Sequence, residues 1–266
     1  MISVIIPTFN REKLISHAIN SVLTQTYPVL EILVCDDGST DNTESVVNSF
    51  NNEKIKYIKC DHSGKPAVPR NVAITKAKGN WIAFLDSDDE WLPHKLESQM
   101  SLLNKYELKA ICSNALRVDS NKKNQGDYLQ NSRSRKFGFG ELLHENVIIC
   151  SSVLIEKKLI DKCGLFNEED EFRAIEDYLL WLKVAKQSQW YYVSESLLKY
   201  NDDFTNSIRS TDVRRGDEQK RLILDYLEKW ISKDDFINYS LIVEMHAKNK
   251  SKKVRLIDKF KRIFKV

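Results

Sequence analysis

The chain lacks the cysteine, histidine and apolar patterns that mark several large classes of protein. Its five cysteines are scattered without a Cys-x-x-Cys pair, and its five histidines show no metal-ligand spacing. These absences argue against a zinc site or a disulfide framework and favour a reducing compartment. No apolar run approaches the roughly 18 residues of a transmembrane helix. The chain enters a strand-like run at Ile2 without a basic leader, so we expect a cytoplasmic protein.

Two familiar nucleotide-binding signatures are also missing. No Gly-x-Gly-x-x-Gly occurs anywhere in the chain. The segment Ser63–Pro66 departs from a P-loop, because Lys59 and Pro66 replace the first glycine and the final serine or threonine of that motif. A dinucleotide-dependent dehydrogenase and a P-loop kinase are therefore disfavoured.

Positive charge is concentrated at the C-terminus. Residues 250–266 hold eight Lys or Arg and one acid, so they contribute +7 to a net charge of +3 and leave −4 on the rest. A nucleic-acid binder would spread its basic residues over a folded face, so no nucleic-acid partner is expected. The tail also places Val254, Ile257 and Phe260 on one helical stripe, which is typical of an amphipathic helix on an anionic membrane. A solvated tail is the open alternative.

The order of apolar runs predicts an α/β fold. In the first 113 residues, strand-like runs alternate with helical patterns, and the strands are apolar throughout, which indicates a parallel sheet covered on both faces. The predicted strands are 2–6, 31–35, 55–59, 81–85 and 109–113, and the predicted helices are 13–24, 41–50, 69–78 and 92–105. The second half is less regular, with a polar loop at 119–136, a strand at 148–155, a helix at 174–187 and two helices between 214 and 246.

Polar residues follow three of these strands. Pro7–Asn10 follows the first, Asp36–Ser39 the second and Asp86–Asp88 the fourth. Because ligands bind at the carboxyl ends of strands in an open parallel sheet, these clusters predict one shared site. The first two suit a nucleoside, and the third suits a divalent metal on a diphosphate. A solvated acidic turn before the helix near Pro93 remains an alternative for the third.

Glu176 and Asp177 open an apolar helix in the second half. They can complement the dipole at the helix N-terminus, or one of them can serve as a general base. Spacing alone favours the first of these two interpretations.

Together these segments resemble the family 2 glycosyltransferases, which have the GT-A fold. The resemblance rests on Val4–Asn10, Ile32–Asp41, Phe84–Asp89, which looks like the family's D-x-D motif, and the pair Glu176-Asp177. It implies an inverting enzyme of the bacterial surface-glycan type, with a Rossmann-like, mostly parallel central sheet, helices on both faces and further C-terminal helices. The implied organisation is a GT-A domain over 1–212 (nucleotide-sugar half 1–115, acceptor half 116–212), helices over 213–249 and the basic amphipathic tail over 250–266.

The resemblance also implies roles for individual residues. The donor nucleotide sugar would contact Pro7, Thr8, Asn10, Asp37, Arg70, Asn71, Asp86 and Ser87. Asp88 would bind Mn²⁺ or Mg²⁺, Asp177 would act as the general base, and Glu176 would position a sugar. Trp91 would pack against the acceptor sugar or, equally, belong to the core. No histidine follows Tyr200-Asn201, where some members supply a metal ligand, so ligands beyond Asp88 stay open.

The implied function is a metal-assisted transfer of a hexosyl or N-acetylhexosaminyl group. The donor would be a nucleotide sugar, with a UDP-sugar favoured, and the acceptor would be a glycan or lipid-linked saccharide used in polysaccharide biosynthesis. We expect the protein to lie peripherally on the inner face of the cytoplasmic membrane. A sugar-nucleotide-forming nucleotidyltransferase and a non-catalytic nucleotide-sugar-binding module are the alternatives.

Overall fold

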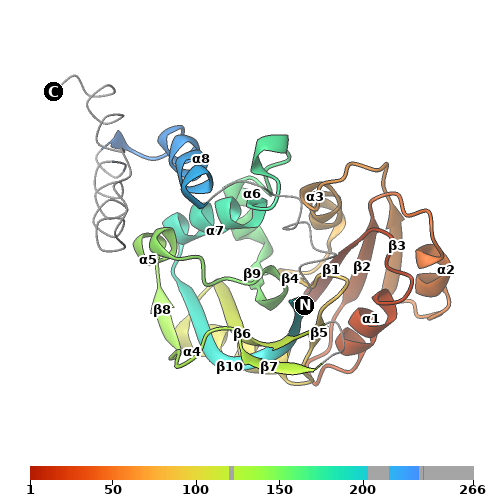
Figure 1. The fold of residues 1–266 in the computed structure, drawn as a ribbon. Helices are drawn as coiled ribbons and strands as arrows, with labels where there is room; N and C mark the ends of the chain where they lie inside the picture. Colours follow the sequence, from red (N-terminus) through yellow and green to blue (C-terminus); the bar gives the residue numbers. More distant parts are fainter. Residues whose placement is uncertain (120–122, 203–215, 234–235, 237–266) are drawn as a thin grey trace.

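The computed structural model describes residues 1–119, 123–202, 216–233 and 236 (Figure 1). The chain is a mixed α/β structure built on one ten-stranded sheet. The predicted tail over 250–266 and the second of the two helices predicted between 214 and 246 fall outside the described residues.

The first four long strands form the parallel part of the sheet. They are β1 (Ile2–Thr8), β2 (Glu31–Asp36), β3 (Ile55–Lys59) and β4 (Trp81–Phe84), in the spatial order β3-β2-β1-β4. Every residue of β1 and β2 is buried, which explains why the central residues of both strands are apolar. The predictions for this half of the sheet are confirmed.

The second half of the sheet is mostly antiparallel. The short strand β9 (Leu154–Glu156) lies between β4 and β6 (Ala110–Val118) and runs antiparallel to both. The strand β10 (Trp190–Asn201), which the sequence did not predict, is parallel to β6. Three short strands pair antiparallel at the margins: β5 (Glu90–Trp91), β7 (Asn124–Asp127) and β8 (Arg135–Phe137).

Two predictions for this half are wrong in detail. The polar stretch predicted as a loop at 119–136 contains β7 and the start of β8, whose largely exposed residues do not need apolar side chains. The strand predicted at 148–155 is reduced to β9, because a 3₁₀ turn, η1 (Cys150–Ser152), precedes it. That turn places the backbone oxygens of Ser151 and Ser152 as acceptors for the buried side chains of Trp91 and Gln99.

Helices cover both faces of the sheet. One apolar core lies under α1 (Ile15–Leu23), α2 (Thr43–Asn48) and α4 (Lys95–Tyr106). The other lies under α3 (Ala67–Lys76), α5 (Phe139–His144), α6 (Lys157–Cys163), α7 (Glu176–Gln187) and α8 (Gly216–Glu228). Side chains of β1 alternate between the two cores, so Val4 and Ile6 enter the first and Ile5 the second.

This arrangement brings the ends of several strands to one edge. The backbone N–H of Asp37 donates to the Thr8 carbonyl at 2.9 Å, and that of Leu85 donates to the Ile5 carbonyl at 3.0 Å. The polar residues after β1, β2 and β4 therefore start from neighbouring positions at the carboxyl edge of the parallel strands.

Gly79 fits tightly between α3 and β4, so its replacement tests the packing of the sheet. A Cβ atom at this position would lie 2.6 Å from the Ser3 backbone nitrogen. The Gly79 N–H also donates to Ser3 Oγ at 2.8 Å, so the two backbones cannot separate without losing a buried hydrogen bond. We expect Gly79→Ala to lower the free energy of unfolding by about 1–3 kcal/mol, as overpacking does.

Urea unfolding measures this loss, and Gly138→Ala is the matched control. No atom lies within 4 Å of a Cβ built at Gly138, whose backbone is extended. Equal stabilities for the two variants would contradict the close contact at Gly79.

Candidate active site

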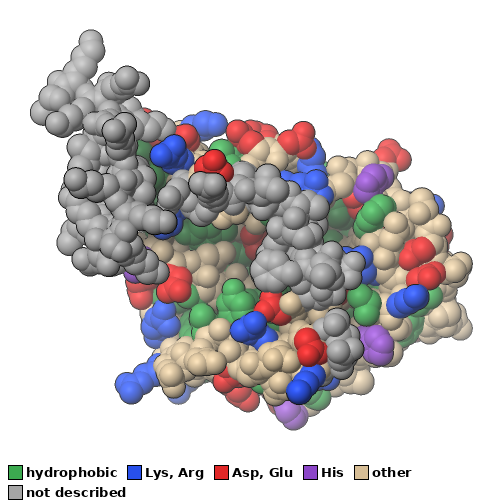
Figure 2. Space-filling model, in the orientation of Figure 1, with side chains coloured by type: hydrophobic (Ala, Val, Ile, Leu, Met, Phe, Trp, Pro, Cys, Tyr) green, Lys and Arg blue, Asp and Glu red, His purple; other side chains and the backbone are tan. Residues whose placement is uncertain are grey.

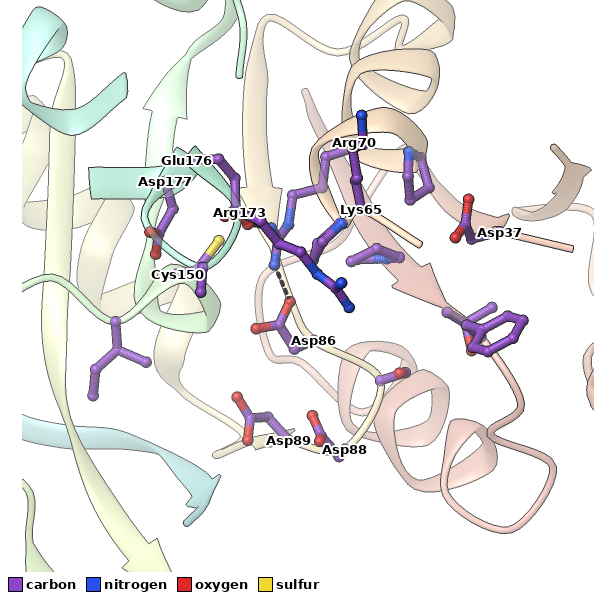
Figure 3. A pocket seen from close by; sticks show the side chains of 18 of the residues that line it. Asp37, Lys65, Arg70, Asp86, Asp88, Asp89, Cys150, Arg173, Glu176 and Asp177 are labelled. Carbon is purple, nitrogen blue, oxygen red and sulfur yellow. Dashed lines mark hydrogen bonds and ion pairs between the residues drawn. The ribbon is translucent and has the colours of Figure 1, made fainter. Parts of the chain in front are cut away.

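A cavity of about 660 Å³ opens at the carboxyl edge of the parallel strands. Its lining comes from the ends of β1, β2 and β10, the loop before α3, the acidic loop after β4, the segment before η1 and the start of α7. Figure 2 shows acidic and basic side chains close together around the centre of this face, and Figure 3 shows the side chains that line the cavity.

Nine of the residues predicted from sequence line this cavity. They are Pro7, Thr8, Asp37, Arg70, Asp86, Ser87, Asp88, Glu176 and Asp177. Two halves of the chain thus contribute to one cavity.

Three other predicted residues lie elsewhere. Asn71 is buried, and its amide donates to the Phe166 carbonyl at 2.9 Å and to Glu168 Oε1 at 2.7 Å, so it fastens the segment before α7 instead of lining the cavity. Asn10 lines a smaller adjoining cavity, and its Oδ1 accepts from the Thr40 backbone at 2.9 Å.

Trp91 has the core role that the sequence left as an alternative. It is 3% exposed, and its indole N–H donates to the Ser151 carbonyl at 2.8 Å. The Lys95 ammonium lies 4.1 Å from the centre of its ring, so both ends of the side chain are occupied by protein. The predicted acceptor contact of Trp91 is therefore corrected.

Asp37 shapes the loop at one end of the cavity. Its Oδ1 accepts from the Ser63 backbone at 2.9 Å and from Ser63 Oγ at 2.7 Å, and its Oδ2 accepts from Gly64 at 2.8 Å. The same loop places His62 against Phe9, with their ring centres 4.3 Å apart and nearly parallel. Thr8 Oγ1, buried beside them, has no hydrogen-bond partner among the described residues. This end of the cavity thus offers aromatic surface and an unsatisfied hydroxyl.

Arg70 joins the two halves of the site. Its guanidinium donates to Asp86 Oδ1 at 2.6 Å and to Glu176 Oε1 at 2.9 Å, and it lies 5.5 Å from the centre of the Phe166 ring. Burial opposes the charge, but the acidic groups around it, including Asp86 and Glu176, hold the pKa of Arg70 well above its usual value. A permanent cation therefore sits between the acidic loop and the start of α7.

Asp177 has the electrostatics of a base that works near neutral pH. Burial and the neighbouring Glu176 carboxylate raise the pKa of Asp177 to about 7, while Arg70 and the hydrogen bond from the Tyr178 backbone (2.7 Å) oppose that rise. Glu176 is held by Arg70, whereas Asp177 lines the cavity with a pKa near neutral, so the two adjacent carboxyl groups have different surroundings.

Asp89 was not singled out from the sequence. It is 2% exposed, its Oδ1 accepts from the Asn201 backbone at 2.8 Å, and its Oδ2 has no hydrogen-bond partner among the described residues. Burial and the carboxylates of Asp88 and Asp86 raise its pKa well above the usual range. The acidic loop thus places the buried Asp89 carboxyl beside two other carboxylates that oppose its ionisation.

Sequence reasoning also missed several lining residues. The main ones are His62, Lys65, Tyr128, Cys150, Arg173 and Tyr200. The described residues have three exposed large hydrophobic side chains, and two of them, Phe9 and Tyr128, line the cavity. No sequence pattern distinguished Tyr128, because it lies in the polar stretch predicted as a loop.

Comparisons with known proteins place the chain among glycosyltransferases. The model of glycosyl transferase family 2 matches residues 3–164. The Escherichia coli protein WfgD, named as a UDP-Glc:α-D-GlcNAc-diphosphoundecaprenol β-1,3-glucosyltransferase, is 32% identical over 93% of this chain and 95% of its own length. Bacillus subtilis TuaG, named as a putative teichuronic acid biosynthesis glycosyltransferase, is 28% identical over 95% of this chain and 97% of its own.

Solved structures show the same fold. The structure of Staphylococcus aureus TarS 1–349 in complex with UDP-GlcNAc superposes with a TM-score of 0.74. The superposition covers 91% of this chain and 70% of the TarS chain, and the aligned residues are 21% identical. At that identity the likeness establishes the GT-A fold and not the substrate.

The ion pairs of Arg70 with Asp86 and Glu176 are expected to contribute to the stability of the fold. We expect Arg70→Met to lower the free energy of unfolding by about 3–5 kcal/mol, because it leaves the buried Glu176 carboxylate without its cation. The double variant Arg70→Met/Glu176→Gln should recover part of that loss, since the Glu176 charge is then absent and the Asp86 carboxylate that loses its partner is about a third exposed (32%).

Urea unfolding of both variants, with the exposed Arg133→Met as control, measures the effect. A double variant no more stable than Arg70→Met would show that the Arg70–Glu176 pair does not cause the loss.

Proposed function

The chain belongs to glycosyltransferase family 2, and from that membership we propose that it transfers a sugar from a UDP-sugar to a hydroxyl of a lipid-linked saccharide, with inversion at the anomeric carbon. The observation that carries the proposal is the raised pKa of Asp177, in a cavity that also holds the acidic loop. A nucleotide-binding module without catalysis would have no use for a proton acceptor tuned to neutral pH.

A UDP moiety suits the end of the cavity formed by β1 and β2. The stacked rings of Phe9 and His62 offer a surface for a base, and the buried Thr8 hydroxyl offers an unsatisfied polar partner. The TarS structures with UDP and with UDP-GlcNAc show that proteins of this fold can bind such ligands. We therefore favour a UDP-sugar as the donor, without specifying the sugar.

The acidic loop fits a divalent cation that is shared with the substrate. Within the described residues, no three His, Cys, Asp or Glu side chains can enclose an ion by themselves. Asp88 and Asp89 line the cavity, and Asp89 Oδ2 has no hydrogen-bond partner in the part of the chain that the structure describes, so hard oxygen donors are available beside a diphosphate. We propose that Asp88 holds Mn²⁺ or Mg²⁺ together with phosphate oxygens and water. When bound, this cation would act as a Lewis acid on the diphosphate.

Asp177 supplies the proton acceptor for a single displacement. The acceptor hydroxyl attacks the anomeric carbon from the side opposite the diphosphate and gives its proton to the Asp177 carboxylate. The bond from the anomeric carbon to the phosphate oxygen breaks, and its electron pair leaves with UDP. Attack from the opposite side inverts the configuration. Glu176 and Arg70 keep the geometry of the start of α7 fixed.

The acceptor is proposed by analogy with the relative WfgD. WfgD is named for an acceptor in which GlcNAc is joined through a diphosphate to undecaprenol, and it aligns over 93% of this chain. A saccharide on a polyprenyl diphosphate would place the reaction at the inner face of the cytoplasmic membrane. Within the described residues, no helix is long and apolar enough to span a membrane. The proposed contact of residues 250–266 with anionic lipids stays a prediction.

Nucleotide binding can be tested first by thermal shift with UDP, GDP, CDP and dTDP, each with Mn²⁺ or with a chelator. A ligand at about 100 times its Kd stabilises by about 2.7 kcal/mol, which corresponds to a rise of several degrees in Tm. We expect UDP with Mn²⁺ to give the largest rise, and chelator or Asp88→Asn to remove most of it. Asp161→Asn, an exposed carboxylate on α6, is the control. A UDP response indifferent to chelator and to Asp88→Asn would exclude a metal at Asp88.

The role of Asp177 predicts both a rate loss and a pH profile. We expect Asp177→Asn to keep UDP binding and to lose about 10²–10⁴-fold in transfer, the usual contribution of a positioned general base. Only the ionised form of Asp177 accepts a proton. In the wild type, kcat/KM should therefore fall about tenfold per unit as the pH drops below about 7, and it should level off above that value.

Release of UDP from donor and acceptor provides the assay, and release of pyrophosphate instead would indicate a nucleotidyltransferase. Wild-type turnover in Asp177→Asn, or an unchanged acidic limb in that variant, would remove Asp177 from the role of base.

A further inference from the structure

Arg173 is held over the cavity by the residues on both sides of it. Phe172 is 1% exposed, and its ring packs edge-on against Tyr226 at 5.0 Å, while Ile175 is buried in the same core. Between them, Ala174 has φ +70°, a left-handed conformation that is uncommon for a residue with a side chain. The two buried anchors and this sharp turn together direct the exposed Arg173 outward.

The side chain of Arg173, which points away from the apolar core, extends into the cavity. Arg173 lines the cavity three residues before Glu176, and Figure 3 shows its side chain extending from the start of α7 toward the middle of the cavity. Lys65 and, to a smaller extent, Arg173 lower the pKa of the Asp170 carboxyl, so Arg173 lies near a protein acid as other cations of the lining do. Arg70 bonds to Asp86 and Glu176, and Lys65 Nζ lies 2.7 Å from Asp170 Oδ1.

The many carboxyl groups of the lining would repel a diphosphate unless a cation, such as Arg173, faced it. Six carboxyl groups line the cavity, namely those of Asp37, Asp86, Asp88, Asp89, Glu176 and Asp177. A diphosphate brings further negative charge and would be repelled unless cations faced it. Arg is suited to this task because its planar guanidinium donates two parallel hydrogen bonds to phosphate oxygens.

We propose that Arg173 binds the diphosphate of the donor and stabilises the negative charge left on it during transfer. This proposal rests on the function proposed above. As the bond between the anomeric carbon and the phosphate oxygen breaks, its electron pair stays on that oxygen and increases the charge on the departing UDP. A guanidinium donor already in position interacts more strongly with the products of this step than with the intact donor, and so it lowers the barrier.

Isothermal titration of UDP and of uridine into the full chain, with Mn²⁺ present, separates a phosphate contact from a structural role. We expect Arg173→Met to weaken UDP binding by about 10- to 100-fold, the value of a hydrogen bond to a charged group. Binding of uridine, which has no phosphate, should stay within about twofold. Arg173→Lys should lie between wild type and Arg173→Met, because a lysine keeps the charge and loses the paired geometry.

Turnover at saturating donor provides a second readout, with Arg221→Met on the exposed face of α8 as the matched control. We expect kcat to fall about 10- to 100-fold in Arg173→Met and to stay unchanged in Arg221→Met.

Unaltered UDP affinity in Arg173→Met would overturn the proposal, and so would an equal loss of UDP and uridine binding, which indicates a distorted site. A wild-type protein that binds uridine and UDP equally would also overturn it. Absence of any UDP binding by the wild type would instead overturn the proposed function, and this proposal with it.

Discussion

The site depends on one buried interaction, the bonds of Arg70 to Asp86 and Glu176. Asp86 follows β4 in the first half of the chain, and Glu176 opens α7 in the second, so the two carboxylates come from separate parts of the fold. Without a cation between them, their convergence beside Asp177 would cost both desolvation and repulsion. Arg70 removes that cost for two of the three carboxylates. Asp177 lies in the same buried surroundings, where burial and the Glu176 carboxylate raise its pKa to about 7 although Arg70 opposes the rise.

A second set of hydrogen bonds connects the acidic loop to the turn η1. Ser151 Oγ accepts the backbone N–H of Asp86 at 2.9 Å, and the Ser151 carbonyl accepts from Trp91 at 2.8 Å. Lys95, fully buried, donates to Gln99 at 2.9 Å and lies against the Trp91 ring, and burial holds the pKa of Lys95 well below its usual value. The loop that carries Asp86 and Asp88 is therefore fixed at both ends by contacts with the turn η1. This rigidity suits a site whose carboxylates must hold their positions against mutual repulsion.

The sequence predicts the first half of the molecule well because each strand there can be recognised from its own residues. Strands β1, β2 and β4 are almost entirely buried, so each appears as a mainly apolar run, and the carboxyl ends of parallel strands share one edge. The second half follows contacts that are distant in sequence. Strand β9 has three residues and is inserted between β4 and β6, and no local pattern specifies that partner choice. The roles predicted for two individual residues were wrong for the same reason. Asn71 and Trp91 have side chains suited to ligand binding, and only the positions of Phe166 and Ser151 show that protein groups occupy them.

The pair Glu176-Asp177 shows how adjacent residues acquire different chemistry. Successive side chains of an α-helix point about 100° apart, so the first turn of α7 cannot direct both carboxylates at one partner. Glu176 is 5% exposed and forms an ion pair with Arg70, whereas Asp177 lines the cavity and accepts a hydrogen bond from the Tyr178 backbone at 2.7 Å. A carboxyl group whose pKa burial raises to about 7, as for Asp177, has the pKa expected of a general base at neutral pH. The adjacent position that in the sequence favoured a simple helix-dipole role thus gives one carboxyl group an ion pair and leaves the other at the cavity, where we propose that it acts as the base.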